Sequence, residues 1–211
     1  MLDIWFKENF IRRVKMGLDV YCNEVNVRLG SYSRAKELKE ILVYSCILHC
    51  EVKIKEFDQK MYQLEDYSDE WIQVFSDYTD YKGVIYQCYE ILGIGYDKNK
   101  LIDYNVKGVL NYDKIDYFIG DFEGLTYWLR HNETCGYIES DQVYAIIKFL
   151  KLVLRDAVKG FNEKEEKGII NYMRLDIDKI DEMTDEEIFD SFYLSSVLKE
   201  SDNTGEDLCF G

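Results

Sequence analysis

Cysteine and histidine side chains are the first candidates for chemistry in this chain. Both histidines have cysteine neighbours at helical spacing: His49 lies beside Cys46 and Cys50, and His131 precedes Cys135. Residues three or four positions apart share one face of a helix. Thiolates and imidazoles are the ligands of tetrahedral zinc, so Cys46, Cys50, His131 and Cys135 could together form a zinc site.

A structural interpretation competes with the zinc site, and we favour it. Cys46 and Cys50 also fit the apolar face of a helix, where a thiol behaves as a small hydrophobic group. His131 fits the C-terminal end of a helix, which is a favourable place for a cation. We therefore expect no metal and no other cofactor.

Catalytic motifs are missing from the sequence. It contains no G-x-S-x-G, no phosphate-binding glycine loop and no H-E-x-x-H. Asp176, Asp178 and Glu187 fit a calcium loop, but Asp181 stands where that loop needs glycine. We therefore predict that the protein is not an enzyme, and keep a small metal-dependent enzyme as the third hypothesis.

Acidic residues are concentrated in two blocks. Residues 56–123 contain 15 acidic and 6 basic residues, and residues 176–207 contain 12 acidic and 2 basic residues. The formal net charge of the chain is −15, so the remainder is slightly positive. Charge of one sign produces a stronger local field when it is clustered. The clustering therefore indicates a partner of opposite charge.

The two blocks differ in character. The middle block has tyrosine, tryptophan and phenylalanine between its charges, and tyrosine and tryptophan are typical anchors of interfaces. Residues 176–190 hold eight acidic residues and one lysine. If that span is largely helical, one carboxylate falls every ~3 Å, close to the ~3.4 Å between phosphates of a DNA strand.

Helix capping at Thr184 explains part of the C-terminal charge, so the middle block is the stronger candidate for a specific contact. The predicted partner-binding residues of the middle block are Asp66, Asp69, Glu70, Trp71, Asp77, Tyr78, Asp80 and Tyr81. Those of the C-terminal block are Asp176, Asp178, Asp181, Glu182, Asp185, Glu186, Glu187 and Asp190.

Helices must position most of these side chains. The chain contains no proline, the commonest terminator of helices, so long helices are expected. Ser140 predicts the start of an amphipathic helix that ends at Gly160. Thr184 and Glu187 predict a capping box for a helix that runs on through Leu198. Further helices are predicted over residues 2–16, 33–57 (or on to 64), 68–78, 80–92 and 121–129.

Alternating apolar residues predict a small β-hairpin or short sheet near residues 18–29. We therefore predict a mainly α fold, an irregular helical bundle with this small sheet, with α+β as the fallback. Residues 1–199 are predicted to form one globular domain, and the alternative is two lobes divided near residues 93–100. The acidic tail, residues 200–211, is expected to fray.

The six cysteines show no regular spacing, which indicates reduced thiols. Neither a secretory signal nor an apolar run long enough for a membrane is seen. We therefore expect a cytoplasmic protein, located in the cytoplasm of the host cell if its origin is viral or from a phage.

The leading functional hypothesis is a non-catalytic acidic inhibitor that docks on the basic, nucleic-acid-binding surface of another protein. Acidic inhibitors of CRISPR effectors, restriction enzymes, defence nucleases and toxins provide an analogy of charge and size. The alternative is a helical adaptor or assembly protein whose partner need not be basic. Direct binding of nucleic acid is disfavoured because the one basic cluster, residues 7–15, is small beside the net charge of −15.

Overall fold

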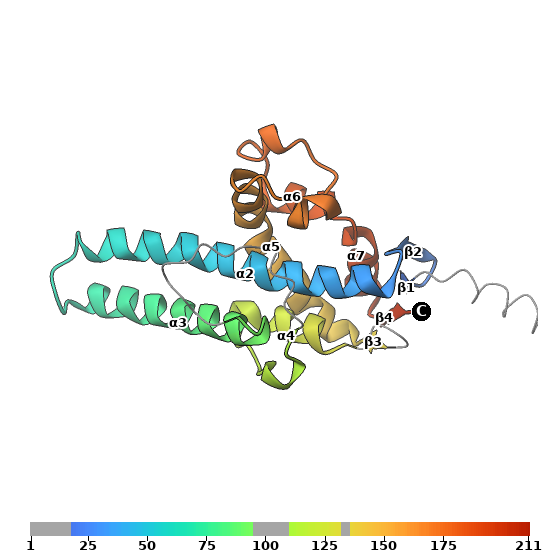
Figure 1. Ribbon diagram of the computed structural model, residues 1–211, viewed down its shortest axis with the longest axis horizontal. Coiled ribbons are helices and arrows are strands. Elements are labelled where there is room, and N and C mark those ends of the chain that lie inside the picture. The colour runs from blue at the N-terminus through green and yellow to red at the C-terminus, as the bar shows by residue number, and fades with distance from the viewer. Residues whose placement is uncertain (1–17, 95–109, 132–135) are drawn as a thin grey trace, which may run out of the picture.

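The computed structural model describes residues 18–94, 110–131 and 136–211, and it confirms a mainly α fold with a small antiparallel sheet (Figure 1). The predicted N-terminal helix, the basic cluster at residues 7–15 and most of the proposed break at 93–100 lie outside these residues. The α-helices are α2 (Tyr32–Met61), α3 (Asp69–Ile91), α4 (Glu123–Arg130), α5 (Ser140–Glu163), α6 (Asp185–Ser191) and α7 (Ser195–Thr204). The strands are β1 (Asp19–Cys22), β2 (Val25–Arg28), β3 (Tyr137–Ile138) and β4 (Leu208–Phe210), and short 3-10 turns lie at Tyr112–Lys114, Gly120–Phe122, Gly168–Tyr172 and Ile177–Lys179.

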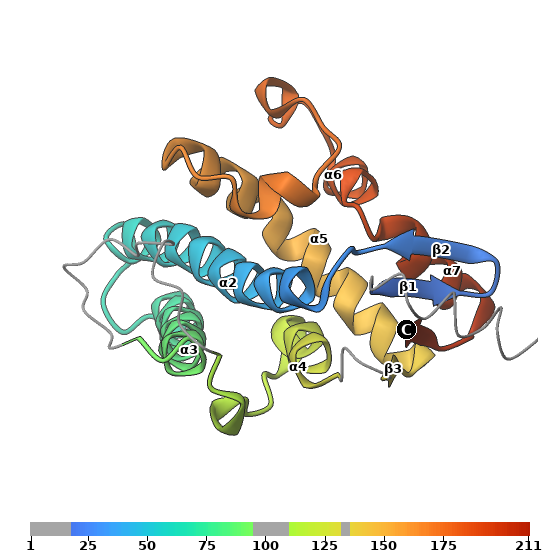
Figure 2. The same cartoon turned by 45° about the vertical axis from the view of Figure 1, so that its right-hand side comes forward.

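Helices α2 and α3 form a long antiparallel hairpin, side by side in Figures 1 and 2. The hydroxyl of Ser31 accepts a hydrogen bond from the amide of Arg34 at the start of α2, and Ser68 caps α3 in the same way. The two helices predicted over 68–78 and 80–92 are one continuous helix. Thr79, which lies between the two predicted ranges, is inside this helix, and its hydroxyl donates a hydrogen bond to the carbonyl of Phe75 one turn earlier.

Helix α5 lies at the centre of the fold and packs against α2, α4, α6 and α7. It begins at Ser140 as predicted but continues past Gly160, which was expected to end it. Gly160 instead allows a close approach to α2, because a Cβ atom there would lie 2.9 Å from a methyl group of Leu48. Gly124 on α4 allows an even closer approach, since its Cβ would lie 2.2 Å from the carbonyl oxygen of Ala145.

The predicted C-terminal helix is two helices. The capping box is confirmed: the Thr184 hydroxyl accepts from the amide of Glu187, and the Glu187 carboxylate accepts from the amide of Thr184. However, α6 ends at Ser191 because Phe192 adopts an extended conformation and pairs with Met173 in an isolated β-bridge. Helix α7 then starts afresh.

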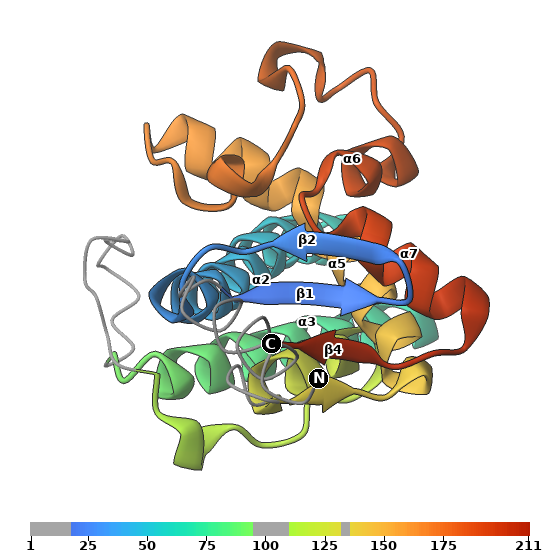
Figure 3. The same ribbon diagram turned by 90° about the vertical axis from the view of Figure 1, so that its right-hand side faces the viewer.

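The sheet has the strand order β2-β1-β4-β3, and every pairing is antiparallel (Figure 3). The predicted hairpin near residues 18–29 is its β1–β2 half. The expectation that residues 200–211 fray is wrong, because α7 runs to Thr204 and β4 lies between β1 and β3. Leu208 is fully buried and Phe210 is 4% exposed. Burial of such side chains stabilises the fold by about 1.5–3 kcal/mol each, which holds the segment in place.

Candidate interaction surface

The outer end of the α2–α3 hairpin extends beyond the main core of the protein (Figure 1). All buried residues of α2 lie between Ala35 and Cys50, and those of α3 lie from Ile85 onward except for Val74. The last 11 residues of α2 therefore extend over roughly 16 Å with no buried side chain, although Ile54 near their start still packs against the core. The core anchors the hairpin at one end and leaves the other end available to a partner.

Four aromatic side chains stack along this outer end. Tyr67 lies 5.3 Å from Trp71 between ring centroids, Trp71 lies 5.1 Å from Phe75, and Phe75 lies 6.3 Å from Tyr78. The planes of Trp71 and Phe75 are only 7° apart. We call Tyr67, Trp71, Phe75 and Tyr78 the aromatic ladder. Spacings of three and four residues place its three helical members on one face of α3.

Two members of the aromatic ladder are exposed to solvent, and the other two, Trp71 and Tyr78, are half-buried. Tyr67 is 79% exposed and Phe75 is 46% exposed, and Tyr62, in the loop after α2, is 91% exposed. Each aromatic side chain can bury about 150–250 Å² at an interface. Single exposed apolar residues are ordinary on a protein surface, but a contiguous group of this kind typically marks an interaction site.

A pocket of about 390 Å³ lies against the ladder at the end of the hairpin. Its walls come from both helices and the loop between them: Asp58, Met61, Tyr62, Leu64, Asp66, Trp71, Phe75 and Tyr78. Two carboxylates therefore line the same pocket as several aromatic rings.

The hairpin end is strongly acidic. Residues 58–80 contain seven acidic residues and one basic residue, Lys60. Lys60 pairs with Glu70 at 3.1 Å, but both side chains are more than half exposed, so the pair contributes little to stability. Asp69 and Glu70 also lie in the first turn of α3, where negative charge stabilises the helix. Asp77 accepts a hydrogen bond from Gln73 one turn earlier, at 2.9 Å, which also supports the helix. These roles leave Asp58, Glu65, Asp66 and Asp80 without that explanation.

Tyr81 does not belong to the aromatic ladder. Its ring makes edge contacts with Phe57 at 5.4 Å and with Phe122 at 5.3 Å, on the inner side of the hairpin. Burial raises the pKa of Tyr81 to about 12. Of the predicted middle-block residues, the structure therefore brings Asp66, Trp71 and Tyr78 together at the pocket and directs Tyr81 away from it.

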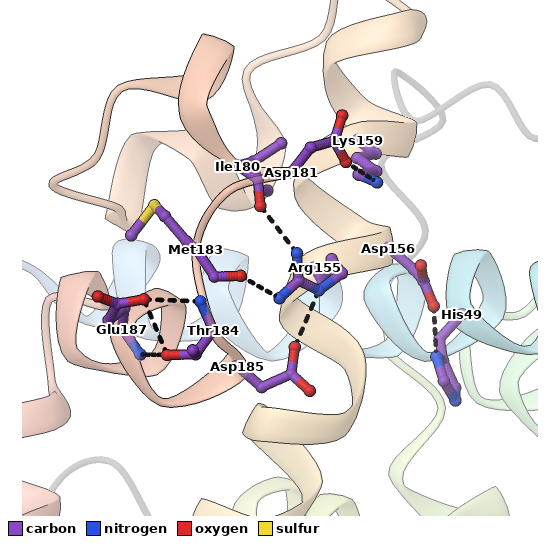
Figure 4. Close-up of polar contacts among 10 residues, drawn as sticks. All are labelled: His49, Arg155, Asp156, Lys159, Ile180, Asp181, Met183, Thr184, Asp185 and Glu187. Carbon is purple, nitrogen blue, oxygen red and sulfur yellow. Dashed lines mark hydrogen bonds and ion pairs between the residues drawn. The ribbon is translucent and has the colours of Figure 1, made fainter.

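The C-terminal acidic block is engaged by basic residues of α5 (Figure 4). Arg155 pairs with Asp185 at 2.9 Å, and its guanidinium also donates to the backbone carbonyls of Ile180, at 2.8 Å, and Met183. Lys159 pairs with Asp181. One face of α5 thus holds the segment before α6 and the first residue of α6.

Further contacts engage most of the remaining carboxylates in this block. Glu186 pairs with Lys151 and Lys199, and Lys199 also pairs with Asp190. The hydrogen bond from Lys151 is the main reason why the pKa of Glu186 is lowered. Asp176 lies 3.7 Å from Lys179. Within the described residues, Asp178 and Glu182 are the two predicted contacts of this block that form neither an ion pair nor a capping bond.

The comparison of this block with a phosphate strand loses its structural basis. It required a largely helical span, whereas residues 176–190 contain a short 3-10 turn, a loop and only then α6. The basic residues of α5 at positions 151, 155 and 159 are spaced four apart, which presents them together to the acidic segment. That spacing is the signal that could have identified their role.

The structure does not assemble the proposed zinc ligands. Cys46 and Cys50 are buried within α2, and burial raises the pKa of the Cys46 thiol well above its usual value. His131 instead stacks on Phe210 of β4, with ring centroids 4.1 Å apart. Cys135 lies outside the described residues, and among those described no group of three or more His, Cys, Asp or Glu side chains is arranged to hold a metal ion.

His131 lies at the C-terminal end of α4, as predicted, and its Nδ1 atom contacts the carbonyl oxygen of Trp128. A lysine from α2 binds the same helix end. The ammonium of Lys39 on α2 donates to the carbonyls of Leu129, at 3.0 Å, and His131, at 2.8 Å. Lys39 is buried. It therefore supplies the cation that a helix end favours, and binds α2 to α4.

His49 forms a buried pair with Asp156 of α5 (Figure 4). The Nδ1 atom of His49 lies 2.7 Å from a carboxylate oxygen of Asp156, and the His49 side chain is 2% exposed. Its Nε2 atom has no hydrogen-bond partner among the described residues, and the imidazole ring packs near the rings of Tyr81 and Phe122. The pair connects α2 to α5.

Comparisons with protein families, curated proteins and solved structures found no match to this chain. Among residues 18–94, 110–131 and 136–211, none of the helices combines the length and apolar character needed to cross a membrane.

Sequence reasoning missed the part that α2 plays in the pocket. Asp58 and Met61 of α2 line it, together with Tyr62 and Leu64 of the following loop, although none was predicted as a site residue. Their contribution depends on how α2 and α3 pack against each other, which no local pattern specifies. The aromatic ladder, in contrast, has a visible signal, because Tyr67, Trp71 and Phe75 follow one another at intervals of four.

Proposed function

We propose that this protein is a non-catalytic acidic binding protein that inhibits a partner by docking on the partner's basic surface. The contact surface is the outer end of the α2–α3 hairpin, and the partner is a nucleic-acid-handling protein or complex. The observation that carries the proposal is the partly exposed aromatic ladder within an acidic segment.

The ladder supplies the features of an energetic centre of an interface. Aromatic residues dominate such centres because they bury a large area with few rotatable bonds. Trp71 and Phe75 already stack on each other, so little freedom of their side chains remains to be lost on binding. These rings would anchor the partner, and the carboxylates around them would select it by charge.

The acidic residues around the ladder favour a basic partner. Complementary charge accelerates association and rejects partners of like charge. A protein that occupies a basic groove excludes the nucleic acid that would bind there, which is the proposed mode of inhibition. The C-terminal block contributes less to the negative electrostatic field of the protein, because the basic residues of α5 and Lys199 offset much of its charge.

A cytoplasmic location is part of the proposal. The five described cysteines, at positions 22, 46, 50, 88 and 209, are all free thiols. Free thiols are typical of a reducing compartment. For a viral or phage protein, that compartment would be the cytoplasm of the host.

Photo-crosslinking tests the proposed surface. A photoreactive phenylalanine analogue replaces Tyr67 in one variant and Tyr144 in a control variant; Tyr144 is 62% exposed in the first turns of α5. Both variants are expressed in cells of the native host, and crosslinked proteins are identified by mass spectrometry. We expect one nucleic-acid-handling protein to be captured from position 67 and not from position 144.

The captured protein is then purified, and its affinity and activity are measured with the unmodified chain. We expect inhibition, and a dissociation constant that rises at least about tenfold between low and high salt, because exposed charges are screened. An affinity independent of salt would favour the helical adaptor without a basic partner. Equal capture from positions 67 and 144 would overturn the proposed surface.

A further inference from the structure

We propose that the pocket at the hairpin end is a subsite for a single arginine side chain of the partner. The inference rests on the proposed function for the source of that arginine. The pocket itself supplies the chemistry: flat aromatic walls from Trp71, Phe75 and Tyr78, and the carboxylates of Asp58 and Asp66.

The size of the pocket suits one long side chain. Its volume of about 390 Å³ is at the lower end of the roughly 300–1,000 Å³ typical of ligand sites. A helix or a nucleobase pair would not enter a space of this size, whereas an extended arginine would. The pocket lies between exposed Tyr62 and the aromatic ladder, so the side chain can enter from solvent.

A cation of the protein itself lies over one ring of the aromatic ladder. The ammonium of Lys82, one turn further along α3, lies 4.4 Å from the ring centroid of Tyr78. An aromatic face attracts a cation because of the negative potential above the ring. One ring that lines the pocket, that of Tyr78, therefore already contacts a cation, and Trp71 and Phe75 supply further rings of this kind.

Arginine fits these groups better than lysine. The guanidinium group is planar, so it can lie flat against Trp71 or Phe75 while its edge donates to a carboxylate. An ammonium group is not planar, so it contacts an aromatic ring over a smaller area, and it is more strongly hydrated. Asp58 on α2 and Asp66 in the loop line the pocket and offer carboxylate acceptors.

Peptide titration of the isolated full-length protein tests the subsite. The probes are three capped pentapeptides, with a central arginine, lysine or citrulline between glycines; citrulline keeps the shape of arginine without its charge. Binding is followed by NMR, using the indole N–H of Trp71, which is assigned from the spectrum of Trp71→Phe. The chain's other tryptophans serve as internal references.

We expect saturable shifts at Trp71 with the arginine peptide, with a dissociation constant on the order of 1 mM. The lysine peptide should bind several-fold more weakly, and the citrulline peptide should produce no saturation. The double variant Asp58→Asn, Asp66→Asn should reduce arginine binding about tenfold or more. The matched control Asp178→Asn, Glu182→Gln, in the C-terminal block, should not change it.

Equal binding of arginine and citrulline, or no shift at Trp71 with any peptide, would overturn the subsite. This outcome is distinct from failure of the proposed function. If the peptides fail but Tyr67 still captures a basic partner, the hairpin surface stands and the arginine subsite is wrong. If arginine binds but capture does not depend on the hairpin end, the proposed function is wrong and the subsite stands.

Discussion

Arg155 of α5 and Asp185 of α6 form an ion pair 2.9 Å long, and the same guanidinium holds the chain just before α6 through two backbone carbonyls. A carboxylate in this position serves the protein's own fold. The two acidic blocks therefore differ. Ion pairs of the C-terminal block attach α6 to α5, whereas fewer carboxylates at the hairpin end form contacts that stabilise the fold.

Charge reversal should separate the two roles. The triple variant Asp185→Lys, Glu186→Lys, Glu187→Lys places positive charge against Arg155 and breaks the capping box. We expect its melting temperature to fall by at least about 5 °C, measured by circular dichroism. The control Glu65→Lys, Asp66→Lys, Asp80→Lys, at exposed positions of the hairpin, should melt within about 2 °C of the original protein. Equal melting of the two variants would contradict this division.

The pH dependence of stability should reflect the same contacts. The pKa of Asp181 is lowered by Lys159, that of Glu186 by Lys151, and that of Glu187 by the capping box. A carboxyl group with a lowered folded pKa stabilises the fold fully above its unfolded pKa, and this stability is lost as pH falls through the folded pKa. The ordinary values are 3.8 for Asp and 4.5 for Glu. We therefore expect these groups to keep their full stabilising effect from pH 7 to about 5, and to lose it as the pH falls below about 4.

Urea unfolding at pH 7, 5, 4 and 3 measures this loss. Lys159→Gln removes the partner of Asp181 and should reduce the decrease in stability between pH 5 and pH 3. An unchanged decrease in that variant would show that Asp181 does not contribute to it.

Partner binding should depend on the aromatic ladder. Trp71→Ala removes the ring that contacts both Tyr67 and Phe75. We expect the affinity for the captured partner to fall at least about 30-fold, as for the anchors of other interfaces, by calorimetry at fixed salt. Tyr144→Ala is the control and should leave the affinity unchanged. A similar loss in both variants would argue against an anchor on the hairpin.

Two glycines should respond in opposite ways to the same substitution. Gly124→Ala places a methyl group against the backbone of α5, so it should lower the free energy of unfolding by about 1–3 kcal/mol or more. Gly83→Ala, within α3 and with open space around it, should raise it by roughly 0.5–1 kcal/mol. Chemical denaturation of both variants measures these changes, and destabilisation by Gly83→Ala would show that α3 is not helical at that position.

The His49–Asp156 pair should be energetically coupled. Asp156→Ala leaves the buried His49 Nδ1 without its partner and should cost about 1–3 kcal/mol. His49→Leu and the double variant complete a mutant cycle. We expect a coupling energy of at least about 0.5 kcal/mol, whereas strictly additive effects would indicate that the pair does not stabilise the contact of α2 with α5.

Local signals in the sequence predicted the helices best. Ser68 and Thr184 are caps at the expected positions, and the apolar repeat of α5 is recognisable because it repeats every three to four residues. Signals that depend on distant contacts failed. Gly160 resembles a helix end in sequence, but it lies where α5 meets Leu48, which only the packed structure specifies.

The candidate site was partly predictable for the same reason. The aromatic and acidic character of the middle block is visible in the sequence, and the face shared by Trp71 and Phe75 follows from their spacing. The contribution of Asp58 requires the α2–α3 pairing. Likewise, the charge of the C-terminal block is offset through contacts such as the ion pair of Arg155 with Asp185, which are 30 residues apart in the sequence.

The position of β4 has a consequence for the order of folding. Strand β1 pairs with β4, although the two strands lie far apart in the sequence. The thiol of Cys22 at the end of β1 contacts the carbonyl of Glu206 just before β4, and these two residues are 184 positions apart. Closing so large a loop is entropically costly, and contacts between distant residues slow folding. The α2–α3 hairpin, joined by a short loop, can form early, while the sheet must wait for the last residues. During synthesis on a ribosome, the hairpin would therefore emerge and pair long before the sheet can close behind it.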